Sequence, residues 1–283
     1  MNFHQTPAVY VSKVSLLTEN LGALLRFYTE TIGFKILEKS ESKAVLTADG
    51  KTPLLVIEQA ADLKPARMRS AGLYHFALLL PGRADLANVL MHLLESGYPL
   101  QGASDHSVSE ALYLSDPDGN GIEIYRDRPS GEWSWTGSGV HMTTEQLQAE
   151  AVLAEKTDEG WKGLPEETVM GHIHLQVSDL KQAGEFYTKA LSFDIVAEYG
   201  SRALFISTER YHHHIGLNTW NSLGAGTREE HMTGLSSYTL KFPDESARKD
   251  ALTKLKEYGA APYEKDRQIY VKDPSGIVIE LSV

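Results

Sequence analysis

An internal repeat constrains this chain more than any other feature of its sequence. Four segments of the 283-residue chain each open with an apolar strand, continue with an amphipathic helix, and end with two or three further strands. Aligning the opening strands gives spacings of 62, 97 and 65 residues between the equivalent positions Lys13, His75, His172 and Ser237. Repeats of this size are supersecondary units that bury their apolar faces against one another. The sequence therefore predicts an α+β protein built from four βαβββ modules.

The middle spacing contains roughly 34 extra residues, which divide the chain in two. We expect modules one and two in residues 1–127, a connecting segment with one helix (residues 144–155) in 128–170, and modules three and four in 171–283. The connecting segment contains three tryptophans, which indicates that it packs on the body of the protein. The four module helices are expected at residues 21–31, 84–95, 181–190 and 245–258.

The stretch from His106 to Glu123, in the second module, carries the strongest sign of a functional site. Residues 111–114 and 121–125 are expected to form two antiparallel strands. The Asp-Pro-Asp-Gly sequence at 116–119 joins them as a tight turn, because proline presets φ and glycine accepts a positive φ. Glu123 then lies on the opposite face of its strand from the two flanking isoleucines. Burying a carboxylate on a concave sheet face is costly unless it is paired or binds a metal.

Composition limits the classes of partner. The formal net charge of −11 argues against nucleic acid, because phosphate binding requires a basic face. The chain contains no cysteine, which excludes disulfides and thiolate chemistry and fits a reducing cytoplasm. It contains neither a signal-peptide pattern nor a run of about 18 apolar residues. We therefore expect a cytoplasmic protein that does not enter a membrane.

The four modules resemble those of the vicinal oxygen chelate superfamily, which includes glyoxalase I, bleomycin-resistance proteins and extradiol dioxygenases. The resemblance covers nearly the whole chain outside the connecting segment, and its clearest motifs are GHIHLQVSDL, YHHHIGLN and DPDGNGIEIY. The stretch from His106 to Glu123 is similar to the extradiol dioxygenase signature, of the catechol 2,3-dioxygenase type. Two residues before it, Ser104 departs from the usual choice at that position of the signature. The resemblance implies two cupped mixed sheets, in which two modules close around one metal.

Ligands in this superfamily come from the first and last strands of paired modules. If modules two and three pair, the resemblance implies that His75, His172 and Glu123 form the two-histidine, one-carboxylate triad that binds Fe(II). Mn, Ni and Zn are the alternative metals. His214 would match the acid–base histidine of the family, since Arg210 lies just upstream of it.

The resemblance also assigns roles around the substrate. His106 and Tyr113 would hydrogen-bond a catechol, with Tyr113 donating to a substrate oxygen. His174 shares a face with His172 but is expected to pack within the sheet. Lys13 and Ser237, at the equivalent positions of the other two modules, are interpreted as traces of a degenerate second site.

Two assignments stay open at this stage. A register error of two residues would put His212 in the place of His214, while His213 on the opposite face is expected to face solvent. Pairing of modules three and four would instead recruit Glu280 together with His172 and His214. We favour the pairing of modules two and three, because it supplies more ligands and the full signature.

The predicted function is extradiol cleavage of a small catechol-type aromatic substrate with O₂. One alternative is a glyoxalase I-type lyase or isomerase, in which His214 would be a fourth ligand beside the triad for Ni²⁺ or Zn²⁺. Another is a non-catalytic protein, similar to bleomycin-resistance proteins, that binds an antibiotic in an aromatic cleft. The sequence leaves the oligomeric state open, a homodimer included.

Overall fold

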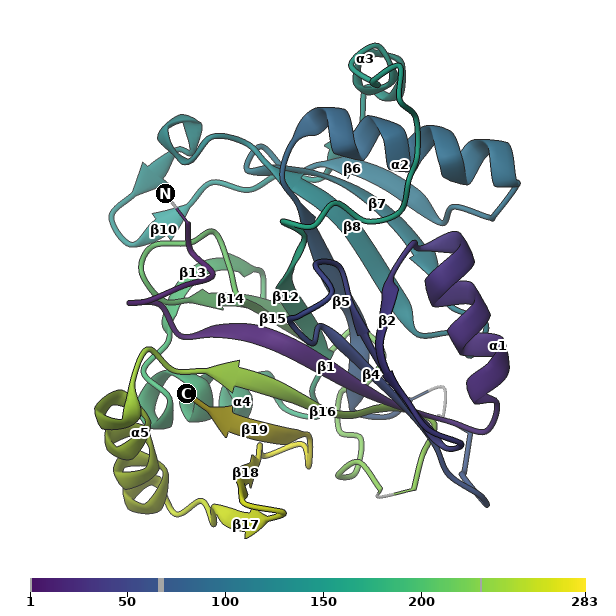
Figure 1. Cartoon of the computed structure of the whole chain (residues 1–283). Coiled ribbons are helices and arrows are strands. Elements are labelled where there is room, and N and C mark those ends of the chain that lie inside the picture. The colour runs from purple at the N-terminus through teal and green to yellow at the C-terminus, as the bar shows by residue number, and fades with distance from the viewer. Residues whose placement is uncertain (1, 66–68, 230) are drawn as a thin grey trace.

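A computed structural model describes residues 2–65, 69–229 and 231–283 of the chain. Two large curved sheets of eight and nine strands lie against each other, with helices on their outer sides (Figure 1). The helices of all four modules are present, and the strands follow each helix in the predicted order. The predicted α+β class, with four modules in two cupped mixed sheets, is therefore confirmed.

Modules one and four form the eight-stranded sheet, in the order β17-β18-β19-β16-β1-β4-β3-β2. The first strands of the two modules, β1 and β16, pair antiparallel at its centre. The strands of this sheet are β1 (Tyr10–Thr18), β2 (Lys35–Lys39), β3 (Lys43–Thr47), β4 (Leu55–Gln59), β16 (Gly234–Lys241), β17 (Tyr263–Lys265), β18 (Gln268–Lys272) and β19 (Val278–Ser282).

Modules two and three form the nine-stranded sheet, in the order β11-β6-β7-β8-β5-β12-β15-β14-β13. Their first strands, β5 and β12, pair antiparallel at its centre, which confirms the favoured pairing of modules two and three. Each sheet therefore combines one module from either side of the connecting segment. Its strands are β5 (Gly72–Leu80), β6 (Gly102–Asp105), β7 (Ser109–Ser115), β8 (Gly121–Asp127), β11 (Glu145–Gln146), β12 (Val169–Gln176), β13 (Asp194–Tyr199), β14 (Ala203–Ser207) and β15 (Ile215–Asn218).

The helices begin and end where local chemistry requires. Asn20, Asp179 and Asp244 each accept a backbone hydrogen bond at a helix start, and left-handed glycines follow the two longest helices. None of the described helices combines the length and apolar character that a membrane span requires. The helices are α1 (Leu21–Arg26) with the π-helical turn η1 (Phe27–Thr31), α2 (Arg83–Ser96), the 3₁₀ turn η2 (Ser130–Glu132), α3 (Ala149–Leu153), α4 (Leu180–Glu185) with the π-helical turn η3 (Phe186–Ala190), and α5 (Glu245–Tyr258).

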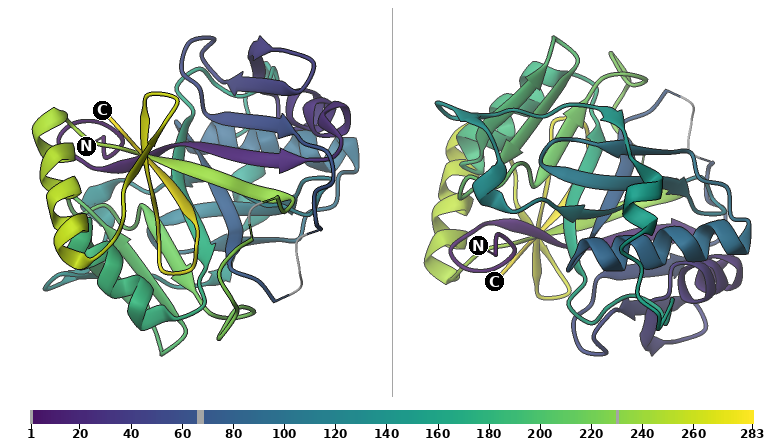
Figure 2. Two further views of the ribbon diagram at one scale, coloured as in Figure 1. Left: turned by 90° about the horizontal axis from the view of Figure 1, so that it is seen from below. Right: turned by 90° about the horizontal axis from the view of Figure 1, so that it is seen from above.

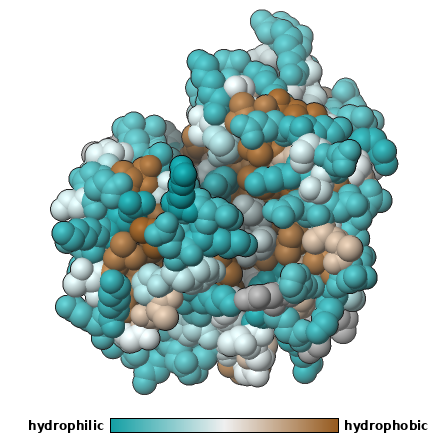
Figure 3. Space-filling model, turned by 60° about the horizontal axis from the view of Figure 1, so that its bottom comes forward, coloured by the Kyte–Doolittle hydropathy of each residue, from teal (hydrophilic) through white to brown (hydrophobic). Residues whose placement is uncertain are grey.

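One continuous apolar core fills the space between the two sheets and under the helices. It includes Leu16 of β1, Phe76 of β5, Ile173 of β12 and Tyr238 of β16, all of which are fully buried. Figure 2 shows the two sheets packed against each other from two further directions. The face seen in Figure 3 is mostly hydrophilic, with hydrophobic side chains gathered in separate patches. The apolar strand faces are thus buried between the sheets, as the repeat pattern predicts.

Two buried tyrosines tie the sheets together. Tyr28 donates a hydrogen bond of 2.7 Å to Asp116, in the turn between β7 and β8. Tyr187, at the equivalent position of module three, donates to Asp273 in the matching turn of module four. Each bond joins a helix of one sheet to a turn of the other. Sequential modules are therefore linked by hydrogen bonds, although they belong to different sheets.

The connecting segment differs in part from its prediction. The helix expected over 144–155 is only the short α3, and Glu145 and Gln146 instead form β11, which pairs with β6. The exposed edge of β6 offers unpaired backbone groups, and pairing with it outweighs the local helix preference. The prediction that the tryptophans pack on the body is confirmed. Trp133 is buried against Phe3, Trp135 lies under the Arg210 guanidinium, and Trp161 stacks on His92. Two-residue strands β9 (Trp135–Thr136) and β10 (Gly139–Val140) form a small ribbon here.

Candidate metal centre

The three side chains expected to bind a metal come from three adjacent strands. In the centre, Ala77 of β5 pairs with Glu123 of β8 on one side and with His172 of β12 on the other. His75, two residues before Ala77, projects from the same face of β5. Because alanine is small, the three longer side chains converge above it. One ligand atom from each of His75, Glu123 and His172 lies within 4.8 Å of the others.

The cluster is buried, and both histidines contact the carboxylate of Glu123. His75 Nε2 lies 3.0 Å and His172 Nε2 lies 3.2 Å from Glu123 Oε2. The three residues are 7%, 1% and 3% exposed, respectively. Although burial opposes its charge, the neighbouring imidazoles hold the pKa of Glu123 well below its ordinary value. Burial lowers the pKa of His172, against the attraction of Glu123. The site therefore offers an ionised carboxylate and a neutral imidazole, the forms in which these groups bind metals.

An unpartnered nitrogen indicates that the cluster fits a cation. His75 Nε2 is buried and makes no hydrogen bond within the described part of the chain, despite its short distance to Glu123. Leaving such a group unpaired costs about 1–3 kcal/mol. Two imidazoles and one carboxylate are a ligand set used by divalent first-row metals. A divalent metal at this position would satisfy His75 and neutralise Glu123.

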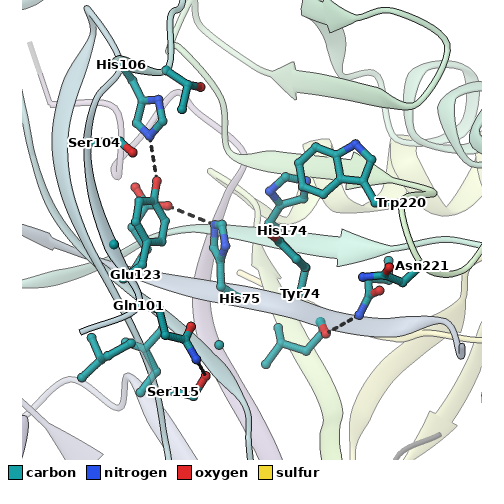
Figure 4. Close-up of a pocket in the computed structure, with 18 of the residues that line it drawn as sticks. Tyr74, His75, Gln101, Ser104, His106, Ser115, Glu123, His174, Trp220 and Asn221 are labelled. Atoms are coloured by element: carbon teal, nitrogen blue, oxygen red, sulfur yellow. Dashed lines mark hydrogen bonds and ion pairs between the residues drawn. The ribbon is translucent and has the colours of Figure 1, made fainter. Parts of the chain in front are cut away.

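The cluster opens into a cavity of about 650 Å³ between modules two and three. Figure 4 shows Trp220 and Asn221 on the other side of this cavity from Glu123 and His106. Tyr74, His174 and Trp220 form one wall, with ring centroids 5.1–5.3 Å apart. None of the described lining residues is a lysine or an arginine. The cavity thus combines a metal-competent end with an aromatic, uncharged wall.

His106 and Tyr113 both line the cavity, and Tyr113 pairs with Glu123 across β7 and β8. His106 Nδ1 lies 2.6 Å from the Thr143 carbonyl, which can only accept, so this nitrogen carries a proton. In the neutral ring, His106 Nε2 is then the acceptor of the 2.7 Å bond from the Tyr113 hydroxyl. Burial, followed by the charge of Glu123, raises the pKa of Tyr113 well above its ordinary value. Tyr113 therefore directs its proton to His106 rather than to a substrate, and presents an oxygen that accepts.

The run of three histidines requires a correction. His214 does not line the cavity, because its Nε2 contacts the Phe3 carbonyl at 3.0 Å and its Nδ1 contacts the Ser207 hydroxyl. His213, which was expected to face solvent, is buried and lines the cavity, with its ring 4.2 Å from that of His172. Strand β15 begins only at Ile215, so simple alternation does not extend back through the histidines. His212 points away to Asp127.

The alternative site, in which Glu280 of module four would join His172 and His214, is not formed in the structure. Glu280 lies in the other sheet, where it forms an ion pair of 3.0 Å with Lys13 and accepts from Thr239. Ser237 pairs with Ser15 of module one. Module four thus pairs with module one, and the alternative with modules three and four together is wrong. Lys13, at the position equivalent to His75, thus pairs with the Glu280 carboxylate, and the interpretation as a degenerate second site stays a prediction.

Sequence reasoning missed the aromatic wall and the role of His174 in it. His174 is buried, lines the cavity, and has an Nε2 atom without a hydrogen-bond partner among the described residues. The available signal was the shared face of His172 and His174, which are two residues apart on β12. Trp220 follows β15 in a loop, where alternation gives no guide to side-chain direction.

Comparisons with known proteins agree with this geometry. A sequence profile of the glyoxalase/bleomycin resistance protein/dioxygenase superfamily matches residues 10–124 and 169–281. The chain is 45% identical over 269 residues to the catechol-2,3-dioxygenase of Bacillus subtilis (strain 168), covering 94% of each chain. It is 26% identical over 114 residues to biphenyl-2,3-diol 1,2-dioxygenase 3 of Rhodococcus globerulus, covering 40% of this chain and 60% of that protein. The crystal structure of glyoxalase I from Zea mays shares the fold, with a TM-score of 0.60, 15% identity, and 96% and 92% of the two chains covered.

Proposed function

Because the chain belongs to the glyoxalase/bleomycin resistance protein/dioxygenase superfamily, we propose that it is an extradiol dioxygenase, which cleaves a catechol-type ring with O₂ at a single Fe(II). The observation that carries this proposal is the convergence of His75, Glu123 and His172 at one end of a cavity that also contains His106 and Tyr113. The 45% identity to a catechol-2,3-dioxygenase over 94% of both chains supports it.

His75, Glu123 and His172 would hold the iron. When bound in such a triad, Fe(II) supplies open coordination positions and the redox chemistry that O₂ activation requires. The carboxylate balances one of the two positive charges, and both imidazoles are neutral ligands. Ala77 lies between Glu123 and His172 and is fully buried, and its small side chain leaves room for the ligands above it.

His213 is the acid–base residue in this proposal, in place of His214. Its imidazole lines the cavity and packs against His172, so it lies beside the metal-competent cluster. It would take the proton of a catechol hydroxyl and return it as the ring opens. Tyr113 would accept a hydrogen bond from the second hydroxyl, because its own proton is committed to His106. His106 is in this way a positioning residue for Tyr113.

The cavity favours an uncharged aromatic substrate. Its wall of Tyr74, His174 and Trp220 offers ring faces and edges to an aromatic ring. No lysine or arginine among the described lining residues would pair with a carboxylate substituent. The net charge of −11 likewise gives no attraction for an anion. We therefore expect catechols with neutral substituents to be preferred over those with acidic ones.

The glyoxalase-type alternative loses its fourth ligand. That reading needed His214 beside the triad, but His214 is bonded to Phe3 and Ser207 on the far side of the chain. The metal-competent cluster of the described residues has three members, which leaves more open positions than an isomerase site with four ligands. A binding protein without a metal would also not require a buried, ionised Glu123.

Oxygen uptake provides the test. The purified protein is loaded with Fe(II) without air, then mixed with catechol and air, while oxygen consumption and the yellow ring-cleaved product are followed. Stoichiometric uptake of O₂ with product formation is expected. Loading with Zn²⁺ in place of Fe(II) is the matched control, since zinc has no redox chemistry. The proposal fails if the Fe(II)-loaded protein consumes no oxygen with any catechol tested.

A further inference from the structure

A chain of three polar side chains runs from the cavity to Asp127 at the end of β8. His213 Nδ1 lies 2.9 Å from His212 Nδ1. On the opposite edge of its ring, His212 Nε2 lies 2.8 Å from Asp127 Oδ1. His212 is fully buried and His213 is 8% exposed. The two histidines and the carboxylate thus form one continuous path of hydrogen bonds.

The direction of these bonds follows from the chemistry of the groups. An ionised carboxylate only accepts, so His212 Nε2 must carry a proton and donate it to Asp127. In a neutral imidazole the other nitrogen is then an acceptor, so His212 Nδ1 accepts. His213 Nδ1 must therefore carry a proton and donate. The neutral His213 ring is left with its proton on Nδ1 and a free lone pair on Nε2.

The surroundings hold His212 in this orientation. Its ring centroid lies 4.0 Å from that of Tyr211 and 5.1 Å from that of Trp133, and the Tyr211 and Trp133 rings contact each other as well. The Tyr211 hydroxyl also donates to Asp127 Oδ1, at 3.3 Å, which occupies a second lone pair of the carboxylate. A fully buried ring in contact with two aromatic side chains has little freedom to flip.

We propose that Asp127 and His212 are positioning residues that fix the tautomer of His213, so that His213 Nε2 faces the cavity as a hydrogen-bond acceptor. This inference rests on the proposed function, in which His213 takes a proton from the substrate. The ligand that such a nitrogen recognises is a hydroxyl group, and a catechol supplies one. The hydrogen-bonded path also orients the imidazole plane of His213, and it ends at the partly exposed Asp127, the last residue of β8.

A substitution at Asp127 can reverse the direction in which hydrogen bonds are donated along the path. In Asp127→Asn the side-chain amide can donate to His212 Nε2, which makes His212 Nδ1 the donor and His213 Nδ1 the acceptor. His213 then carries its proton on Nε2 and no longer accepts from a hydroxyl. Loss of an orienting partner of this kind typically lowers activity about 10–100-fold. We expect kcat to fall by that factor, with the KM for catechol nearly unchanged.

Two measurements test the inference together. The tautomer of His213 is read from the ¹⁵N resonances of histidine-labelled, Zn²⁺-loaded protein, in which His213 is assigned by the signals that His213→Gln removes. The kcat and KM for catechol are measured on the Fe(II)-loaded protein. The variants are Asp127→Asn, Asp127→Glu as the conservative rescue, His212→Phe as a second break in the path, and Tyr211→Phe as the matched control. Tyr211→Phe removes another hydrogen bond to Asp127 but leaves the path intact.

The expected result is an Nδ1-protonated His213 in the wild type, in Asp127→Glu and in Tyr211→Phe, with an altered tautomer in Asp127→Asn and His212→Phe. A thermal unfolding midpoint close to wild type separates a tautomer effect from misfolding. The inference is overturned if wild-type His213 is protonated at Nε2, or if Asp127→Asn and His212→Phe both leave the tautomer and kcat unchanged. Failure of the proposed function would instead appear as absence of turnover in the wild type, and the resonance experiment would still decide on the tautomer.

Discussion

His213 and His214 are consecutive residues whose imidazoles lie on opposite sides of the chain. His213 lines the cavity against His172, whereas His214 Nε2 contacts the Phe3 carbonyl at 3.0 Å. The bond to Phe3 ties the N-terminal segment to module three. The Nε2 atom of His213, by contrast, makes no hydrogen bond to the backbone of the described residues. Of these two neighbouring histidines, one is therefore bonded within the protein and the other is exposed to the cavity.

This contrast predicts different losses in two matched variants. His213→Gln is expected to lower kcat for catechol about 10²–10⁴-fold, the usual contribution of a general acid–base group, while the iron content stays at wild-type level. His214→Gln should retain kcat within a few-fold and lose roughly 1–2 kcal/mol of unfolding free energy through its broken hydrogen bonds. Turnover, metal analysis and denaturant unfolding check all four values. Equal losses of kcat in both variants would contradict the assignment.

The two sheets provide a matched test of metal binding. Glu123→Gln is expected to lower the metal content of the protein strongly, because the neutral amide cannot balance the charge of the cation and is a weaker ligand. Glu280→Gln, at the equivalent position of the other sheet, should bind the same amount of metal as the wild type, since Lys13 already pairs with Glu280. Metal analysis after dialysis against Fe(II) or Zn²⁺ measures both. Metal loss in Glu280→Gln would show that the ion binds in the eight-stranded sheet and would contradict the assignment.

Metal binding should also be visible as stability. Because the cation binds the folded cluster and not the unfolded chain, Zn²⁺ at 100 times its dissociation constant is expected to add about 2.7 kcal/mol of unfolding free energy. Removal of the metal with a chelator should reverse the increase. The comparison uses thermal unfolding with and without Zn²⁺ for the wild type and for Glu123→Gln, in which the increase should vanish. An equal increase in both proteins would show that zinc stabilises the chain elsewhere.

A second matched pair tests the hydroxyl at the cavity. Tyr113 pairs with Glu123 across β7 and β8, just as Tyr270 pairs with Glu280 across β18 and β19. Tyr113→Phe leaves His106 Nε2 without its donor and removes an acceptor for the substrate, so kcat/KM should fall roughly 10-fold, the equivalent of one hydrogen bond. Tyr270→Phe should have no effect on kcat/KM. Steady-state oxygen uptake distinguishes the two outcomes.

Asp273 predicts a pH dependence of stability. Burial raises the pKa of Asp273 from 3.8 to about 7 in the folded protein. Well below pH 4 the Asp273 carboxyl group is protonated in both the folded and the unfolded state, so it imposes no penalty on folding. As the pH rises from 4 to 7 the unfolded state loses its proton first, so stability falls, and the penalty is complete above pH 7.

The variant Asp273→Asn tests this sign. Its amide keeps an acceptor for the backbone groups of Ser275 and Ile277 but does not ionise. Between pH 5 and pH 8 the wild type should lose roughly 2–3 kcal/mol more unfolding free energy than the variant. Urea unfolding at the two pH values measures the difference. If the wild type gains stability relative to Asp273→Asn over this range, Asp273 is ionised in the folded state at pH 5.

Several features were predictable because their signals are local. The turn at Asp116 and Gly119, and the strands on either side, follow from residue chemistry and alternation. The repeat spacing gave the four modules, and the positions of His75, Glu123 and His172 follow from the repeat together with the resemblance. The helix of the connecting segment was predicted too long, because the edge of β6, distant in sequence, competes for residues 145–146.

The sequence by itself thus determined the module pattern, the fold class and the residue types that meet at the site. Only the tertiary structure decided which histidine of the run at 212–214 reaches the cavity, and that His212 meets Asp127, 85 residues away. Alternation fixes which neighbours share a face, but the phase depends on where a strand begins. Strand β15 begins at Ile215, and its pairing with β12 and β14 sets that start. Contacts between distant segments therefore carry the information that the local pattern lacks.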